Sequence, residues 1–284
     1  MIVSIVIPAF NEEKNIERLL ISIRKQALKK FAQKDIEIIV VDDESRDNTA
    51  EIAKRYSKQV YRRKHAERSV QRNFGAAKAH GKYMLFLDGD MELTESVIQS
   101  SLDNIDSYGG LIIPERTVGT GFIASVRKFE RKMYMGDPSI EVARFFPKKV
   151  FWEYGGYDKN LTGTEDYDLP KRISAKYEIG WAKEYLLHHE TGLTLAKQLK
   201  KKFYYAKKSA AYVDKHPDLI SKQGILILRK AYLVHWREFV KHPILGAALI
   251  VMRTLETIAA AIGFLTAVGP VGFIRTFWKM ISNL

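Results

Sequence analysis

Cysteine is absent from this chain of 284 residues. Without thiols the protein can form neither disulfide bonds nor thiolate metal sites. Any bound metal ion must therefore be held by carboxylate, imidazole or substrate oxygen atoms. The absence is compatible with a reducing compartment. With 46% hydrophobic residues the chain can bury a substantial core, so its composition does not call for the disordered class.

Sequence signatures of several common enzyme classes are also missing. Gly119-Thr120-Gly121 has no third glycine and does not follow the first predicted strand, so the dinucleotide-binding fingerprint is absent and a hydride-transfer enzyme is not expected. No serine lies in a nucleophile-elbow pattern, and no glycine-rich phosphate loop ends in Gly-Lys-Ser/Thr. Met1 to Pro8 lacks the basic segment and longer apolar stretch of a signal peptide, so we expect the N-terminal part to stay in the cytoplasm.

The surplus of positive charge lies in the C-terminal third. The chain has 46 Lys and Arg against 33 Asp and Glu, a formal net charge of +13. From Thr191 onward we count 15 against 4, a net of +11, which leaves 31 against 29 for the rest. A basic tail beside apolar segments favours attraction to anionic lipid headgroups over a nucleic-acid groove. A soluble basic helix face is the alternative.

The first half of the chain alternates between strand and helix patterns. The predicted strands are 2–7, 36–41, 59–61, 83–87 and 111–114, and the predicted helices are 12–29, 47–56, 69–79 and 95–104. Short apolar strands separated by helices are typical of a mostly parallel sheet that is covered on both faces. We therefore expect an α/β, Rossmann-like fold.

Asp88-Gly89-Asp90 directly follows the apolar run 83–87 and places two carboxylates just past a buried strand. That position is where open α/β sheets bind ligands. Two hard oxygen ligands separated by a glycine suit a divalent cation that keeps open positions for phosphate oxygens. An isolated Asp-Gly turn facing solvent is the alternative.

Other loops reach the same predicted edge of the sheet. Pro8-Ala9-Phe10-Asn11-Glu12 follows the first strand, and Asp42-Asp43 follows the second. Carboxylates accept hydrogen bonds from the ring N–H of uracil or guanine and from ribose hydroxyls, and Phe10 offers an apolar surface to a base. The segment 68–73 begins a helix with two arginines, which favours phosphate. Taken singly, each residue could only cap a helix or close a turn.

Together these segments resemble the family 2 glycosyltransferases of the GT-A fold. The matching segments are 6–12 (VIPAFNE), 40–47 (VVDDESRD), 72–77 (RNFGAA), 86–90 (FLDGD), 155–158 (GGYD) and 164–169 (TEDYDL). They occur in the family's order over roughly residues 1–190.

The resemblance implies roles for individual residues. The nucleotide-binding residues are Pro8, Ala9, Phe10, Glu12, Asp42, Arg72, Asp88 and Gly89. Asp42 recognises the base, and Arg72 lies near the diphosphate. Asp88 and Asp90 hold Mn²⁺ or Mg²⁺, which bridges the diphosphate oxygens.

Thr164-Glu165-Asp166 matches the segment that carries the family's general base. Asp166 takes the proton from an acceptor hydroxyl that attacks the anomeric carbon opposite the leaving diphosphate, and a single displacement implies inversion. Glu165 orients the acceptor or supports the loop. His188-His189 resembles a late histidine that completes the metal site in some relatives; strand alternation predicts that only one of the two faces the metal, and we favour His189.

The C-terminal part has a different character. The stretch 195–208 interleaves lysines with aromatic residues, as interfacial helices do. The apolar stretch 243–274 is interrupted by Arg253 and Glu256, which are placed to pair on one helix face, and Gly269-Pro270 breaks it. Two hinged helices in one leaflet are therefore predicted, with a buried hairpin or a dimer interface as the alternative. We divide the chain into a catalytic domain, 1–192, and a membrane-associating helical region, 193–284.

The sequence thus predicts a metal-dependent inverting glycosyltransferase. It would move a sugar from a UDP- or GDP-sugar to a lipid-linked acceptor, a polyprenyl phosphate or a lipid-linked glycan, at the cytoplasmic face of a membrane with anionic lipids. No nucleic-acid partner is expected. A non-catalytic module that binds nucleotide-sugars or lipids and a nucleotidyltransferase are the alternatives.

Overall fold

The computed structural model describes residues 1–29, 31–190, 192–215 and 230–281. The chain divides into two compact units. Unit 1 comprises Met1–Arg116, Glu141–Lys159 and Glu165–His189; unit 2 comprises Thr117–Ile140, Asn160–Thr164 and Glu190–Leu284. Unit 2 therefore contains, besides the C-terminal region, two segments that lie within the predicted 1–192 domain.

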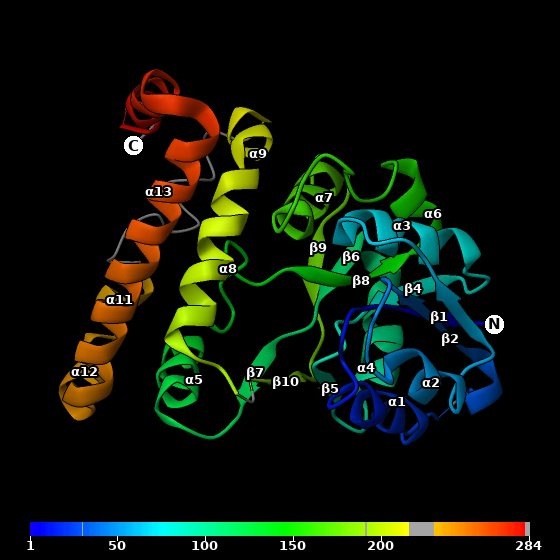
Figure 1. Cartoon of the computed structure of the whole chain (residues 1–284). Helices are drawn as coiled ribbons and strands as arrows, with labels where there is room; N and C mark the ends of the chain where they lie inside the picture. The colour runs from blue at the N-terminus through cyan, green and yellow to red at the C-terminus, as the bar shows by residue number, and fades with distance from the viewer. Residues whose placement is uncertain (30, 191, 216–229, 282–284) are drawn as a thin grey trace. The chain divides into compact units, whose positions relative to one another are not determined.

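A seven-stranded sheet forms the centre of unit 1 (Figure 1). Its strands, in spatial order, are β3 (Gln59–Arg62), β2 (Ile36–Asp42), β1 (Val3–Ala9), β4 (Tyr83–Phe86), β8 (Ala143–Pro147), β6 (Gly110–Ile112) and β9 (Ile179–Trp181). β3, β2, β1 and β4 are parallel, as are β6 and β9, whereas β8 runs antiparallel between β4 and β6. The predicted α/β class with a mostly parallel sheet is confirmed.

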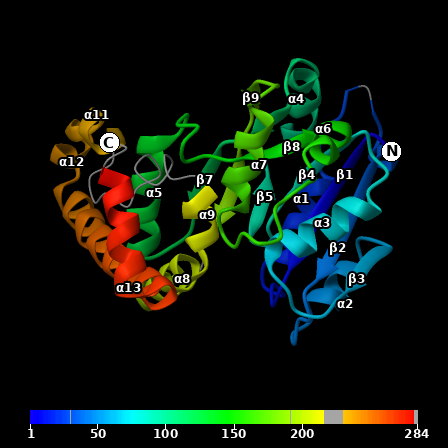
Figure 2. The same ribbon diagram turned by 90° about the horizontal axis from the view of Figure 1, so that it is seen from above.

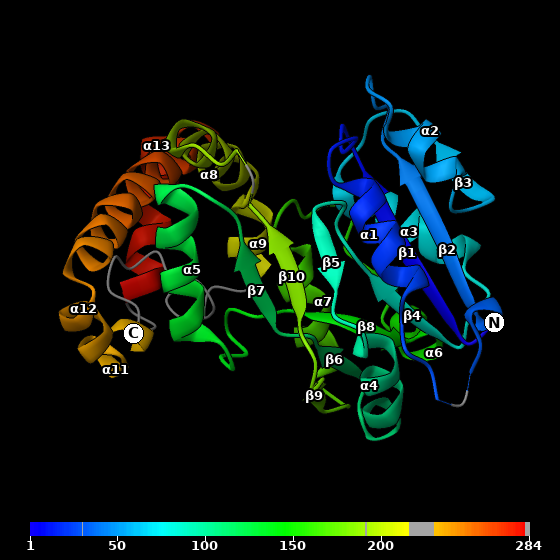
Figure 3. The ribbon, with the colours of Figure 1, turned by 90° about the horizontal axis from the view of Figure 1, so that it is seen from below.

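Helices cover both faces of this sheet. In unit 1 they are α1 (Ile16–Arg24), α2 (Thr49–Lys54), α3 (Arg68–Lys78), α4 (Val97–Asn104), α6 (Lys148–Glu153) and α7 (Glu165–Ile173), with short 3-10 turns η1 (Gln33–Asp35) and η2 (Ile105–Ser107). Figures 2 and 3 show the unit from opposite sides, with α3 in front of the sheet in Figure 2 and α1 in front of it in Figure 3. The predicted helix 12–29 is shorter in the structure, since α1 ends at Arg24.

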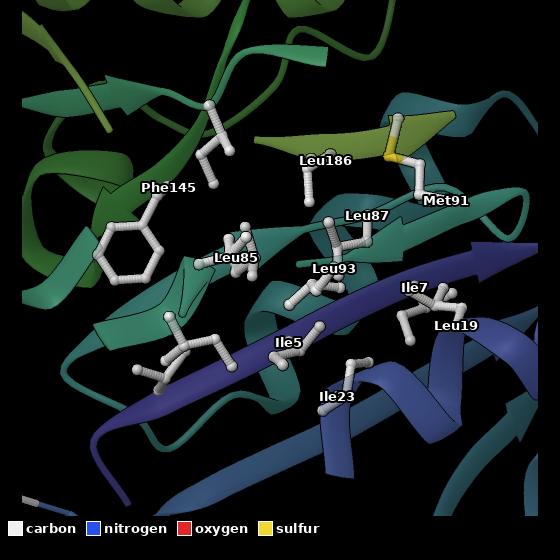
Figure 4. Packing of buried hydrophobic residues seen from close by; sticks show 14 of the residues in the cluster. Ile5, Ile7, Leu19, Ile23, Leu85, Leu87, Met91, Leu93, Phe145 and Leu186 are labelled. Carbon is white, nitrogen blue, oxygen red and sulfur yellow. The ribbon is translucent and has the colours of Figure 1, made fainter. Parts of the chain in front are cut away.

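The core of unit 1 has two layers because successive side chains of β1 point to opposite faces. Ile5 and Ile7 pack with Leu19 and Ile23 of α1, as Figure 4 shows. Val6 lies in the other layer, on the side of α3. Each of these side chains is fully buried, and burying one large aliphatic side chain contributes about 1.5–3 kcal/mol.

A second, three-stranded sheet has the order β5 (Met91–Leu93), β10 (Leu186–His189), β7 (Glu115–Val118). β5 and β10 are antiparallel, and His188 pairs with Met91. β5 follows the Asp88-Gly89-Asp90 turn directly. The pairing therefore brings the two histidines of β10 to the acidic turn after β4.

Unit 2 is helical. It contains α5 (Phe122–Tyr134), α8 (Leu195–Lys208), α9 (Ala210–Lys215), α11 (Lys230–Val234), α12 (Trp236–Lys241) and α13 (Pro243–Ile281). α8 and α13 lie side by side in all three ribbon views and contact each other extensively (Figures 1–3). Gly269 of α13 has a left-handed backbone, φ 70°, and Pro270 follows it. The break predicted at this dipeptide is confirmed.

A buried ion-pair network joins α13 to α5. Arg253 donates from Nε to Glu130, over 2.6 Å, and from Nη1 to Glu256, also over 2.6 Å. Glu130 is fully buried and also accepts a hydrogen bond from the Tyr232 hydroxyl. The predicted Arg253–Glu256 pair is confirmed, and the structure adds a partner from a helix far away in the sequence.

Candidate active site

The acidic turn lies at the edge of the sheet where β1, β2 and β4 end. Ala9 and Asp42 close the parallel pair β1–β2, and the amide of Leu87 donates to the carbonyl of Val6. Gly89 packs against Glu12, so closely that a Cβ at this position would come within 2.7 Å of the Glu12 Cγ. Only glycine leaves room for this approach. The loops after β1, β2 and β4 therefore converge, as the sequence predicts.

Arg72 of α3 is the centre of the site. Its side chain is fully buried, and Nη2 donates to Asp88 Oδ1 over 2.8 Å. Nη1 donates to Glu165 Oε1 over 3.3 Å and also to Asp166. One guanidinium therefore connects the acidic turn after β4 to the Glu165-Asp166 pair at the start of α7, although the two segments are far apart in the sequence.

A second buried arginine, Arg144 of β8, completes a closed circuit. Arg144 pairs with Asp88 Oδ2 at 3.5 Å and with Glu115 Oε1 at 2.7 Å. Glu115 Oε2 lies 3.0 Å from His188 Nδ1, and His188 Nε2 lies 3.2 Å from Asp90 Oδ2. Both aspartates of the turn are thus linked through these three side chains, and the circuit fixes their orientation.

The two histidines of β10 point to different partners. His188 lies between Asp90 and Glu115, whereas His189 Nε2 contacts Glu92 Oε2 at 2.7 Å. The sequence predicts that one of the pair faces Asp90, and the structure places His188 there, not the favoured His189. The reason is the register of β10 against β5, which pairs His188 with Met91.

The donor atoms around Asp90 fit a divalent cation that is shared with a substrate. In the described ranges no group of three or more His, Asp or Glu side chains is arranged to hold a metal ion alone. The Asp90 carboxylate and the His188 imidazole, 3.2 Å apart, provide two ligands of a kind that Mn²⁺ accepts. A cation here would take its remaining ligands from phosphate oxygens and water.

The charges of the site shift several pKa values. Burial alone would raise the pKa of Asp88, but the charges of Arg72, Arg68 and Arg144 hold it well below its usual range. For Glu165, burial and the neighbouring Asp166 charge raise the pKa to about 7, although Arg72 opposes them. Asp88 is therefore a permanent anion, whereas Glu165 can carry a proton near neutral pH.

Glu12 is the second carboxyl with a raised pKa. Burial, and then the charges of Asp90 and Asp88, raise it to about 7 against the hydrogen bond from Asn15. The side chain lies against Gly89, so a positive or hydrogen-bonding ligand near the acidic turn would lower this pKa again.

Asp42 has the properties of a recognition residue. Its carboxylate is fully buried at the end of β2, and within the part of the chain that the structure describes neither oxygen accepts a hydrogen bond. Arg62 Nε lies 3.6 Å from Oδ2. A buried acceptor of this kind is costly unless a ligand N–H satisfies it.

An exposed aromatic surface lies next to the first loop. Phe10 is 46% exposed, and its ring centroid is 5.1 Å from that of His65. The imidazole of His65 is held by Asp43, with Nδ1 2.7 Å from Oδ2. Pro8 and Ala9 place Phe10 here as the last residues of β1. The surface suits a planar ring such as a nucleobase.

The sequence pattern marks neither Glu115 nor His65 as a site residue, and Arg144 lies in a stretch without a distinctive signal. Neither Arg144 nor Glu115 lies in a motif segment. Arg144 reaches the site because β8 inserts between β4 and β6, and Glu115 because its strand, β7, lies next to β10 in the second sheet. His65 had one available signal, since it follows the basic run Arg62-Arg63-Lys64 just before the helix that carries Arg72.

His188 predicts a pH dependence of stability. Burial opposes its protonation, but hydrogen bonds with Asp90 and Glu115 outweigh burial and raise its pKa from 6.5 to about 9. A raised pKa in the folded state gives stabilisation that is complete below pH 6.5 and is lost as the pH rises through about 9. With a metal chelator present, we expect the unfolding free energy to fall by about 3 kcal/mol between about pH 6 and about pH 10 because His188 loses its proton.

Urea unfolding across this pH range checks the expectation by comparing wild type with His188→Gln. The unfolding free energy of the variant should change less with pH than that of wild type. His235→Gln changes an exposed histidine and serves as the control. If the unfolding free energies of wild type and His188→Gln change equally with pH, His188 is not the group responsible.

Known proteins share this sequence pattern and this fold. The model described as "Glycosyl transferase family 2" matches residues 4–157, which is more than half of the chain. The uncharacterized glycosyltransferase EpsJ of Bacillus subtilis is 32% identical over 165 residues, 54% of this chain and 42% of that protein. Glycosyltransferase AglE of Haloferax volcanii is 27% identical over 224 residues, 72% of each chain. This chain spans less than half the length of the first three curated relatives that it matches, from 28% to 49%.

Two solved structures are similar over nearly the whole chain. S. aureus TarS 1-349 in complex with UDP-GlcNAc has a TM-score of 0.55 at 18% identity and covers 100% of this chain and 89% of its own. The mannosyltransferase PcManGT of Pyrobaculum calidifontis, in complex with GDP-Man and Mn²⁺, has a TM-score of 0.56 at 15% identity, with 99% and 79% covered. At these identities the likeness establishes a shared GT-A fold.

Proposed function

Because this chain belongs to glycosyl transferase family 2, we propose that it transfers a sugar from a UDP- or GDP-sugar to a lipid-linked acceptor at the cytoplasmic face of a membrane. Relatives that are named glycosyltransferases support the reaction class. Neighbours of the same fold that hold UDP-GlcNAc or GDP-Man support a nucleotide-sugar donor. The acceptor class is supported by the long apolar helix α13 of unit 2.

One observation carries the proposal: Arg72 joins the acidic turn to the Glu165-Asp166 pair. Sugar transfer needs a positive charge beside the diphosphate and a base beside the acceptor hydroxyl. The two must be no farther apart than the sugar that is transferred between them. A buried guanidinium that contacts Asp88 and Asp166 at the same time meets this requirement. The same contact favours an enzyme over a module that only binds the donor.

The nucleoside would bind at the loops after β1 and β2. Phe10 offers its exposed ring to the base, and the unsatisfied carboxylate of Asp42 would accept the ring N–H that uracil and guanine both present. Pro8, Ala9 and Glu12 would line the region between the base and the ribose. Gly89 has no side chain and so lets the acidic turn come close to Glu12.

The diphosphate would bind at the acidic turn. Asp90 and His188 would hold Mn²⁺ or Mg²⁺, which supplies electrophilic stabilisation of the leaving diphosphate when it is bound. The sequence also predicts Asp88 as a metal ligand, but its two carboxylate oxygens pair with Arg72 and Arg144, so we assign it the positioning of the turn. The guanidinium of Arg72 provides a second positive charge for the phosphate oxygens.

Asp166 would act as the general base. It accepts the acceptor's hydroxyl proton as that oxygen forms its bond to the anomeric carbon, while the bond from this carbon to the diphosphate oxygen breaks and the nucleoside diphosphate leaves. One displacement inverts the anomeric configuration. Glu165, whose pKa is raised to about 7, can donate a hydrogen bond in its protonated form and so orient the acceptor.

A donor panel tests the proposal. The protein is incubated with UDP- and GDP-sugars, Mn²⁺ or Mg²⁺ and a membrane lipid extract, and the released phosphate compound is identified. Release of a nucleoside diphosphate together with a glycosylated lipid is the expected result. Release of pyrophosphate would instead establish a nucleotidyltransferase. Donor binding without any release in the presence of lipid would establish a binding module.

A further inference from the structure

One face of α13 carries a continuous stripe of exposed apolar side chains. Along the helix they are Ile244, Val251, Ile258, Ile262 and Leu265, which are 74%, 58%, 51%, 49% and 38% exposed. Their spacings of seven, seven, four and three residues place them on one side of an α-helix. The opposite side is buried, with Leu249, Met252, Arg253 and Glu256 facing α5 or the core of unit 2.

The apolar surface continues beyond this stripe. Leu233 and Val234 of α11 and Trp236 and Val240 of α12 are more than half exposed, as is Trp278 near the end of α13. Both tryptophans are exposed, Trp236 before the stripe in the sequence and Trp278 after it, and tryptophan prefers the boundary between apolar chains and headgroups. So many exposed apolar side chains in one helical unit are typical of an interaction site.

The positive charge of unit 2 indicates which kind of partner the stripe would bind. Unit 2 has 19 Lys and Arg against 7 Asp and Glu, a net charge of +12, whereas unit 1 has 27 against 26. α8, which lies along α13, has six lysines in 14 residues. Two copies of so basic a surface repel each other, whereas anionic headgroups attract it. The stripe therefore fits a lipid surface better than a second copy of the chain.

The buried side of α13 decides how the helix meets the lipid. By length and composition α13 could cross a membrane. However, Arg253 on that side bonds Glu130 of α5, and the lysine-rich α8 packs alongside. A helix that crossed the bilayer would carry these charged neighbours into hydrocarbon, which is costly. Gly269 and Pro270 also redirect the helix before its end.

We infer that α13 lies in the plane of one leaflet of an anionic membrane, with the stripe in the acyl chains and the α8 lysines among the headgroups. This inference extends the membrane association of the proposed function. Its test measures lipid binding and depth, and sugar transfer is measured separately, so either can fail alone.

The absence of cysteine gives a clean background for the depth measurement. Single cysteines replace Ile244, Val251, Ile258 and Leu265 in the full chain and carry an environment-sensitive fluorophore. Vesicles of phosphatidylcholine with or without phosphatidylglycerol are added, with lipids that carry quenchers at shallow or deep positions. With anionic vesicles we expect the fluorescence emission of all four labels to shift to shorter wavelength. We also expect the four labels to be quenched equally, mostly by the shallow quencher.

A gradient of quenching depth along the four positions would overturn the in-plane inference in favour of a spanning helix. Labels that are shielded before lipid is added, together with a doubled mass by light scattering, would overturn it in favour of a dimer. Labels that stay in water, with the chain monomeric, would overturn lipid docking altogether.

A charge substitution gives an independent readout. We expect Val251→Lys with Ile258→Lys to lower vesicle binding at least tenfold, with unchanged thermal unfolding because both side chains are exposed. Ile21→Lys, at an exposed isoleucine of α1 in unit 1, is the matched control and should bind vesicles as wild type does. Wild-type binding should also weaken as salt is raised from about 0.1 to about 1 M. Equal binding by the double variant and wild type would contradict the inference.

Discussion

Replacing Asp166 with asparagine is expected to lower kcat by about 10²–10⁴-fold, because a positioned general base contributes that much to proton transfer. Asparagine keeps the size of the side chain and one acceptor oxygen for Arg72, so the site should keep its shape. It cannot accept the proton from the acceptor hydroxyl. The loss should therefore fall on turnover and leave donor binding nearly unchanged.

Two measurements separate these effects. Release of nucleoside diphosphate in the presence of the lipid acceptor gives kcat, and calorimetry with the donor and Mn²⁺ gives the dissociation constant. Asp103→Asn, an exposed position on α4, is the matched control and should behave as wild type does. A variant at Asp166 that turns over normally would remove this residue from the reaction and favour the binding-module alternative.

Replacing Arg72 with methionine is expected to have the largest effect on stability. The guanidinium is fully buried between Asp88, Glu165 and Asp166, so its loss removes the positive charge that these three carboxyl groups share and leaves Asp88 paired with Arg144. Breaking a buried pair in this way costs about 3–5 kcal/mol. Donor binding should also weaken, since a cation for the diphosphate is lost.

The pH dependence of this loss identifies its cause. Arg72 lowers the pKa values of Asp88 and Glu165, so without the guanidinium both rise in the folded state, and a raised folded pKa gives stability that returns as the pH falls. Urea unfolding at about pH 5 and about pH 8 should therefore show a smaller deficit at the lower pH. Arg24→Met, at an exposed arginine of α1, is the control. An equal deficit at both pH values would mean that packing, and not charge, explains the loss.

The elements that the sequence predicts well are those with a strong local pattern. β1, β2 and β4 are apolar runs bounded by polar loops, and each was predicted within one or two residues. The motif residues at their ends follow automatically, because parallel strands deliver their carboxyl ends to the same edge. Asp42 and Asp88 are predicted at the site on this basis, whereas Arg72 is predicted from the start of its helix.

What the sequence could not predict depends on long-range pairing. The insertion of β8 between β4 and β6 brings Arg144 to Asp88, and no local pattern marks it. Alternation along β10 predicts that only one histidine faces Asp90, but the register against β5 decides which one. Likewise, Glu130 lies on a helix 123 residues before Arg253, so a boundary at residue 192 separates two halves of one ion-pair network.

The shared guanidinium of Arg72 also has a kinetic consequence. In the structure it contacts Asp166, the proposed base, and Asp88 of the acidic turn at the same time. A diphosphate that binds beside Asp88 would compete for the guanidinium and weaken its hydrogen bond to Asp166. A nucleotide-sugar bound as proposed would thus free Asp166 from Arg72, and we expect the two substrates to add in a fixed sequence, with the nucleotide-sugar first and the acceptor second.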